Sequence, residues 1–214
     1  MTDFQVFRDR MVEEQLIARG INGKKVLDAF RRVERHEFVP VSMRDAAYAD
    51  HPLPIGEGQT ISQPYIAALM TQSLDLKGDE KILEIGAGSG YQAAILSGLA
   101  KEVYSVERIS ALAERAEANL KKTGCGNVKV VVGDGTSGLP EKAPYDGIIV
   151  TAAAPEIPED YIRQLKTGGR LVIPVGGMFG QVMTVVKKTE KGVFNEELCG
   201  CVFVPLVGKK GWKE

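Results

Sequence analysis

The sequence predicts an α/β fold: a doubly wound, mostly parallel sheet with an N-terminal helical extension and a C-terminal antiparallel hairpin. Short apolar runs alternate with helical patterns between residues 81 and 175, which is typical of parallel strands joined by crossover helices. A glycine-rich turn follows the first of these runs. Near the end of the chain, the segment between two strand-like runs is too short for a helix, which favours a hairpin.

The length and composition fit one globular domain over residues 1–214. Hydrophobic residues make up 44% of the chain and charged residues 26%, which is ordinary for a globular protein. We expect three parts: an N-terminal helical and active-site segment (1–75), a ligand-binding core (76–176), and C-terminal strands with a tail (177–214). We also expect a monomer.

The charge balance and the cysteine count exclude several classes of protein. Lys and Arg total 27 against 28 for Asp and Glu, so the chain lacks the positive field of a typical nucleic-acid binder. No apolar run approaches the roughly 18 residues of a membrane-spanning helix, and the first residues lack the apolar stretch of a signal peptide. The three cysteines form no CxxC motif. We therefore expect a cytoplasmic protein without nucleic-acid or membrane partners.

The first 80 residues are expected to be helical around one long loop. Apolar residues recur at helical spacing over 3–19 and 22–39, which predicts two helices. Residues 41–63 show no clear period and contain several prolines and glycines, so we interpret them as an ordered loop. A third helix is expected to start at Ser62-Gln63-Pro64, because proline suits a first helical turn, and to end at Lys77-Gly78.

The remaining elements follow from the apolar runs and the periodic segments between them. Strands are expected at 81–85, 103–106, 128–132, 146–150 and 170–175. Helices are expected at 91–99, 109–122 and 158–165. The terminal hairpin is expected to pair 181–187 with 198–204.

The strongest local signal is the turn Gly86-Ala87-Gly88-Ser89-Gly90, which follows a predicted strand and precedes a predicted helix. Glycine lets the backbone turn sharply and lets a ligand approach without a Cβ in the way. Gly86, Gly88 and Gly90 are therefore candidate ligand-binding residues. The alternative is that these glycines only permit close packing of the helix.

Two acidic residues stand at the ends of the next two predicted strands. Glu107 follows Gly86 by 21 residues, where doubly wound folds place a carboxylate that accepts hydrogen bonds from ribose hydroxyls. Asp134, which precedes Gly135, is placed to reach an adenine edge. One ligand that contains both a ribose and an adenine accounts for the glycine turn and for both carboxylates.

The spacing of the glycines narrows the choice of ligand. A dinucleotide site normally has Gly-x-Gly-x-x-Gly, and a P-loop needs Gly-Lys-Ser/Thr; the sequence has neither. The turn instead resembles the first motif of class I methyltransferases, which bind S-adenosylmethionine in a Rossmann-like fold. The segments at 145–150 and 165–172 are similar to further motifs of that class.

Two more segments resemble one family within that class, the protein-L-isoaspartate O-methyltransferases. They are Gln59-Thr60-Ile61-Ser62-Gln63-Pro64 and the C-terminal stretch Val202-Phe203-Val204-Pro205-Leu206-Val207-Gly208. With the glycine turn, the resemblance extends from about residue 4 to about residue 212. It implies methyl transfer from S-adenosylmethionine to the free α-carboxylate of isoaspartyl residues in damaged peptides and proteins. The resulting ester would form a succinimide, which starts repair.

The resemblance also implies roles for particular residues. The hydroxyl of Ser62 would hold the substrate carboxylate, with Thr60 as the second candidate, and the strand around Val204 would lie beside the substrate peptide. An α-carboxylate with a pKa near 3.5 is already ionised, so the reaction needs neither a general base nor a metal. The alternative for Ser62 is a helix N-cap, a common role for serine before proline. Roles for His51, Cys199, Cys201 and Trp212 stay open.

Three other functions are compatible with parts of the sequence. A methyltransferase of a small-molecule acceptor would share the cofactor motifs, but it usually needs a general base or a metal. A nicotinamide-dependent oxidoreductase is disfavoured by the glycine spacing. A non-catalytic adenosine-binding module would bind the cofactor without turnover.

Overall fold

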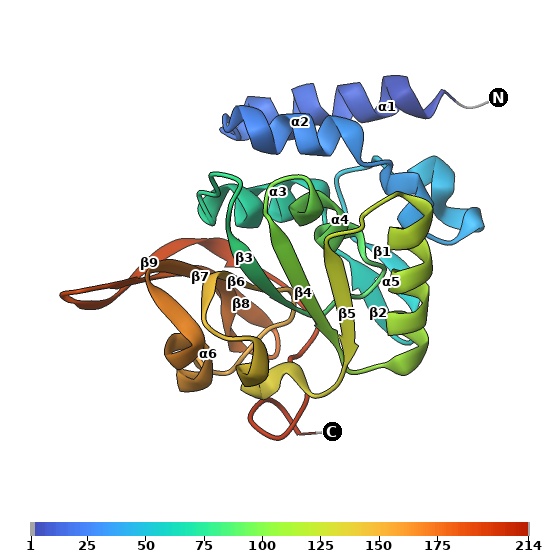
Figure 1. Cartoon of the computed structure of the whole chain (residues 1–214). Coiled ribbons are helices and arrows are strands. Elements are labelled where there is room, and N and C mark those ends of the chain that lie inside the picture. The colour runs from blue at the N-terminus through green and yellow to red at the C-terminus, as the bar shows by residue number, and fades with distance from the viewer. Residues whose placement is uncertain (1–2, 214) are drawn as a thin grey trace.

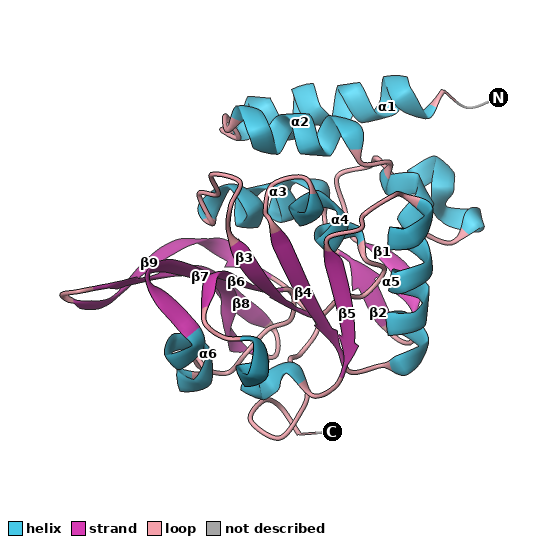
Figure 2. Ribbon diagram, in the orientation of Figure 1, coloured by secondary structure: helices cyan, strands magenta, loops and turns pink. Residues whose placement is uncertain are grey.

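The computed structural model describes residues 3–213 and contains one large sheet with helices on both faces (Figures 1 and 2). Its seven strands lie in the order β5-β4-β3-β6-β7-β8-β9. Their bounds are β3 Lys81–Ile85, β4 Glu102–Glu107, β5 Val128–Val132, β6 Tyr145–Val150, β7 Leu165–Gly177, β8 Gly180–Thr189 and β9 Gly192–Cys201. Strands β5, β4, β3, β6 and β7 run parallel, whereas β8 and β9 join antiparallel. The predicted fold class is confirmed.

The central strands β3, β4 and β6 are buried from both sides. On β3, Ile82 and Leu83 are both fully buried but belong to different hydrophobic clusters. Because successive side chains of a strand point to opposite faces, each face of the sheet has its own core. This explains why the central strands are continuous apolar runs in the sequence.

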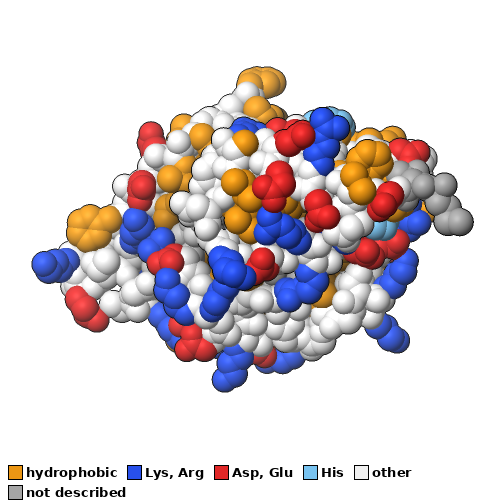
Figure 3. Space-filling model, turned by 90° about the horizontal axis from the view of Figure 1, so that it is seen from above, with side chains coloured by type: hydrophobic (Ala, Val, Ile, Leu, Met, Phe, Trp, Pro, Cys, Tyr) orange, Lys and Arg blue, Asp and Glu red, His pale blue; other side chains and the backbone are white. Residues whose placement is uncertain are grey.

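The helices are α1 Phe4–Met11, α2 Lys24–Arg32, α3 Pro64–Ser73, α4 Tyr91–Ser97, α5 Ser110–Lys122 and α6 Glu159–Gln164. In Figure 1, α1 and α2 form a layer above α3 and α4. The helix predicted over 3–19 is α-helical only at its start; a π turn and a 3₁₀ turn complete it up to Gly20. Figure 3 shows that basic and acidic side chains intermingle on the face above α1 and α2, as expected from the balanced composition.

The segment 41–63, predicted to be an ordered loop, contains regular structure in both halves, because Val41–Ala46 form a 3₁₀ helix and the second half forms two strands. Residues Leu53–Gly56 (β1) and Gln59–Ile61 (β2) form an antiparallel hairpin. Leu53, Ile55 and Ile61 are buried, so the alternation of apolar and exposed residues stabilises the pair. The turn is possible because Glu57 and Gly58 both adopt positive φ, 52° and 67°. The hairpin matters for function because it leads directly into Ser62.

The C-terminal hairpin is confirmed, but its second strand lies earlier in the sequence than predicted. Strand β9 ends at Cys201, so Val204 lies beyond the strand and not inside it. The register explains the difference: Thr189 pairs with Gly192 across a tight turn, and the ladder ends where Gln181 pairs with Cys201. Since β8 begins at Gly180, residues 202–204 have no partner strand on that side.

Candidate active site

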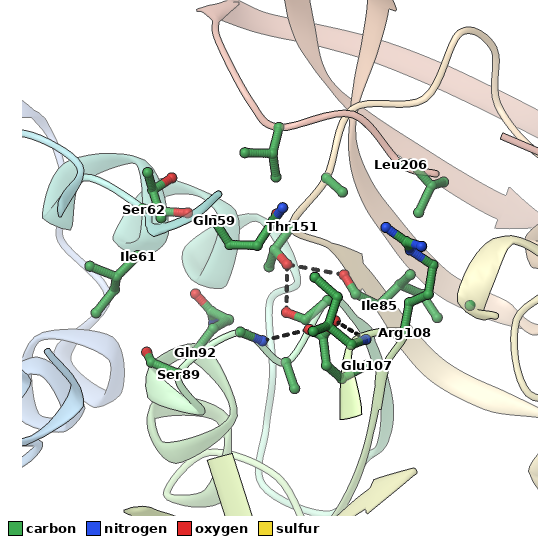
Figure 4. Close-up of a pocket in the computed structure, with 18 of the residues that line it drawn as sticks. Gln59, Ile61, Ser62, Ile85, Ser89, Gln92, Glu107, Arg108, Thr151 and Leu206 are labelled. Atoms are coloured by element: carbon green, nitrogen blue, oxygen red, sulfur yellow. Dashed lines mark hydrogen bonds between the residues drawn. The ribbon is translucent and has the colours of Figure 1, made fainter. Parts of the chain in front are cut away.

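The main cavity opens at the carboxyl ends of β3 and β4 (Figure 4). Strand β3 pairs with β4 on one side and with β6 on the other, so the cavity lies at the point where the order of the strands reverses. Doubly wound folds bind their ligands at this point. The wall is formed by the turn after β3, the end of β4, residues 59–62 and residues 204–207.

Two of the predicted glycines shape this wall. Gly86 has φ of 97°, and a Cβ there would lie 2.4 Å from Thr151 Oγ1. The Thr151 hydroxyl is within hydrogen-bond distance of the carbonyl oxygens of Gly86 (2.7 Å) and Ile85 (3.0 Å) (Figure 4). Gly88 has φ of 54°, and a Cβ there would meet Ile55 of the β1–β2 hairpin at 3.3 Å. Only glycine therefore fits this turn without strain.

Gly90 lies away from the cavity. It has φ of 87° at the N-cap position of α4, and a Cβ would lie 3.2 Å from the carbonyl oxygen of Ala116 in α5. It does not belong to the cavity wall. This geometry favours the alternative role of Gly90, which is to permit close packing of the helices, and not a contact with a ligand.

Glu107 has the position and the geometry of a ligand-binding carboxylate. Its side chain is buried and borders the cavity at the end of β4. One oxygen accepts a hydrogen bond from the backbone N–H of Gly88, and the other accepts one from the N–H of Ile109, each at 2.9 Å. These two donors fix the orientation of the carboxylate, and each oxygen keeps a further lone pair for a hydroxyl of a ligand.

Asp134 and Gly135 lie in different surroundings. Asp134 does not belong to the cavity wall; it accepts hydrogen bonds from the N–H and the hydroxyl of Thr136 and from the N–H of Lys209 in the tail. Burial opposes ionisation, but these donors hold the pKa of Asp134 below its usual value. Gly135 does border the cavity. The side chain of Asp134 thus fastens the tail, and its reach to an adenine stays a prediction.

The tail closes one side of the cavity. Leu206 and Val207 contribute to its wall. The indole N–H of Trp212 donates to the carbonyl oxygen of Ala153 at 3.0 Å, and the Ala153 N–H donates to the carbonyl oxygen of Val204. Trp212 thus fixes the tail in place.

A second cavity adjoins the first on the side of β9 and residues 202–204. Thr60, Ser62, Thr151 and Val204 border both cavities. The predicted substrate residues therefore meet at this junction. Sequence reasoning missed Thr151, although its place directly after the predicted strand 146–150 is the same signal that identified Glu107.

The remaining candidate residues lie in different surroundings. The N-cap of α3 is Gln63, so Ser62 is not the capping residue. His51 is exposed and borders neither cavity, and its Nδ1–H donates to the carbonyl oxygen of Pro52. Cys201 borders the second cavity, and burial raises the pKa of its thiol to about 11. Between residues 3 and 213, no group of three or more His, Cys, Asp or Glu side chains could hold a metal ion.

No helix within the described part of the chain is both long and apolar enough to cross a bilayer.

The strand order, the glycine turn after β3 and the carboxylate at the end of β4 define a Rossmann-like fold of the class I methyltransferase type. Comparison with known proteins then identifies the family. The model of the family described as protein-L-isoaspartate(D-aspartate) O-methyltransferase matches residues 8–211.

Two sequence relatives agree with this match over almost their whole length. A protein-L-isoaspartate O-methyltransferase 1 from Syntrophobacter fumaroxidans is 55% identical over 213 residues, 100% of both chains. One from Geobacter metallireducens is 54% identical over 211 residues, 98% of each chain. A solved protein-L-isoaspartate O-methyltransferase superposes with a TM-score of 0.84 at 32% identity, covering 95% of this chain and 67% of its own. The chain belongs to the protein-L-isoaspartate O-methyltransferase family, and the predicted resemblance is confirmed.

A structure from Plasmodium falciparum supports the fold. It was solved in complex with S-adenosyl-L-homocysteine and superposes with a TM-score of 0.80 at 24% identity, covering 92% of this chain and 96% of its own. At this identity the likeness concerns the fold alone.

Proposed function

We propose that this chain methylates the free α-carboxylate of L-isoaspartyl residues in damaged peptides and proteins, with S-adenosylmethionine as the methyl donor. The observation that carries the proposal is the junction of two cavities. One has the glycine turn and the ribose-type carboxylate that an adenosine ligand requires, and the other opens to the surface beside residues 200–204. The names of the full-length relatives support a protein substrate over a small-molecule acceptor.

The residues of the main cavity fit the donor. Glu107 would accept hydrogen bonds from the ribose hydroxyls, Gly86 and Gly88 would let the ligand approach the turn, and Gly135 would lie against the adenine. The wall that these residues form has no Gly-Lys-Ser/Thr cradle for a phosphate. When bound, S-adenosylmethionine supplies a methyl group on a positively charged sulfur, which is already activated for transfer.

Ser62 and Thr60 would orient the acceptor at the junction. The substrate carboxylate is ionised at neutral pH, so one of its oxygens can form the new bond to the methyl carbon while the sulfur keeps the electron pair of the bond that breaks. No proton moves in this step, and therefore the junction needs hydrogen-bond donors and not a base. Holding the reacting atoms in line can supply several kcal/mol of the barrier reduction. The methyl ester then closes to a succinimide with loss of methanol, and its hydrolysis returns part of the residue to aspartate.

Replacing Ser62 by alanine should lower kcat/KM for an isoaspartyl peptide roughly 10- to 100-fold, because one hydrogen bond to a charged oxygen contributes about 1.5–3 kcal/mol. The dissociation constant of S-adenosylmethionine, measured by calorimetry, should change less than twofold. Ser42→Ala is the matched control, since Ser42 is exposed and borders neither cavity. A larger loss of cofactor affinity than of kcat/KM would show that Ser62 belongs to the cofactor site.

A further inference from the structure

Three large apolar side chains are exposed at the end of the β7–β8–β9 ladder that adjoins the second cavity. Met178 and Phe179 form the tip of the β7–β8 turn and are 60% and 97% exposed, and Val202 is 75% exposed. Val202 itself borders the second cavity. Single exposed apolar residues are common on protein surfaces, but a group of them beside a cavity is typical of an interaction site. We call Met178, Phe179 and Val202 the apolar lip.

The strand register brings the three residues together. Gly177 pairs with Gly180 across the turn, and Gln181 pairs with Cys201 on the other side of β8. Gly180, which precedes Gln181, and Val202, which follows the end of β9, therefore stand at the same end of the ladder. The turn that carries Met178 and Phe179 continues directly from this end.

A buried glutamine fastens the turn to the segment that borders the cavity. Gln181 is 4% exposed. Its side-chain N–H donates to the carbonyl oxygen of Gly177 at 2.6 Å, and its side-chain oxygen accepts a hydrogen bond from the N–H of Phe203 at 2.8 Å. Both ends of one amide are thus used to hold the turn against residues 202–203. The apolar lip is consequently a fixed continuation of the second cavity.

The two sequence segments that contain the lip residues have no charged side chains. Residues 171–186 and 198–208 contain no Asp, Glu, Lys or Arg. A polypeptide that lies across this surface can therefore bury apolar side chains without desolvating a charged group of these two segments.

We propose that the apolar lip binds apolar side chains that flank the isoaspartyl residue in an extended, unfolded segment of the substrate. The inference rests on the proposed function. Residues 200–204 line the second cavity together with Thr60 and Ser62, so a substrate whose carboxylate reaches these two hydroxyls can extend along that segment to Val202, the member of the lip that borders the cavity. Apolar flanking residues are buried in folded proteins and exposed in unfolded ones, so the lip favours damaged segments that have lost their native packing.

The test uses two isoaspartyl peptides of equal length with the full-length enzyme. One carries leucine and phenylalanine around the isoaspartate, and the other carries glycine and serine. For the double variant Met178→Ser, Phe179→Ser, we expect KM for the apolar peptide to rise roughly five- to tenfold, as the loss of roughly 50 Å² of buried apolar surface implies. KM for the polar peptide, kcat for both peptides, and the dissociation constant of S-adenosylmethionine should change less than twofold.

The control variant is Phe194→Ser, on the projecting β8–β9 arm, where Phe194 is 54% exposed but borders neither cavity. It should leave both peptides unaffected. If the wild type methylates both peptides, the inference would be overturned by an equal change of KM for the two peptides in the double variant, or by no change of KM for either. If a second copy of the chain covers the lip, sedimentation would show that the wild type is a dimer and that the double variant is a monomer. That result would also overturn the inference. Failure of the wild type on both peptides would contradict the proposed function itself.

Discussion

Replacing Glu84 by glutamine should remove a pH-dependent loss of stability of about 5 kcal/mol. Glu84 is fully buried in β3, where burial raises its pKa from 4.5 to about 8 in spite of a hydrogen bond from the Ser105 hydroxyl. Between these two pKa values the unfolded chain has released a proton that the folded chain keeps. The stabilising contribution is therefore complete below pH 4.5 and is lost as the pH rises to 8. About 3.5 pH units at about 1.4 kcal/mol each give the stated size.

The measurement is the free energy of unfolding by urea at several pH values from 4.5 to 8.5, for the wild type and Glu84→Gln, both without cofactor. The free energy of unfolding of the variant minus that of the wild type should increase with pH across this range and level off above pH 8. Taking the difference cancels the titration of groups that both proteins share. Glu197→Gln, at an exposed position of β9, controls for the loss of one carboxyl group. A constant difference would show that Glu84 is ionised in the folded protein.

Glu107→Ala should weaken binding of S-adenosylmethionine roughly 30- to 1000-fold, or about 2–4 kcal/mol. The substitution removes the acceptor proposed for the ribose hydroxyls, each worth about 1.5–3 kcal/mol because the acceptor is charged. It also leaves the backbone N–H groups of Gly88 and Ile109 without their carboxylate partner. The wall of the cavity would then lose the contact that orients the glycine turn.

Titration calorimetry with S-adenosylmethionine and with S-adenosylhomocysteine measures this effect. Glu102→Gln is the matched control, since Glu102 is at the opposite end of the same strand and pairs with Lys129. The control should bind both ligands with unchanged affinity. An unchanged dissociation constant for Glu107→Ala would remove Glu107 from the cofactor site.

The parts of the site that could be predicted from sequence are those with a local chemical cause. Gly86 and Gly88 follow an apolar strand, and Glu107 ends the next one, so their meeting at one edge of a parallel sheet follows from the strand periodicity alone. The structure places all three at the main cavity. Ser62 and Thr60 required the family resemblance, because nothing in their own spacing distinguishes a substrate contact from a helix cap.

The parts that could not be predicted depend on contacts between distant segments. The β1–β2 hairpin is only a few residues long and contains Pro54, and it is stabilised by burial of Leu53, Ile55 and Ile61 in a core formed by distant segments. The position of Val204 depends on where β8 begins, which fixes the end of β9. Likewise Gly90 packs against Ala116, and Asp134 accepts a hydrogen bond from Lys209. No local sequence pattern connects the members of either pair.

The central claim is tested most directly by methyl transfer from labelled S-adenosylmethionine to two synthetic peptides that differ only in one residue, isoaspartate or normal aspartate. We predict base-labile label on the isoaspartyl peptide alone, because only the isoaspartyl residue presents a free α-carboxylate within the chain, beside a backbone that can enter the second cavity. Equal labelling of both peptides, or no labelling of either while S-adenosylmethionine binds, would contradict the proposed function.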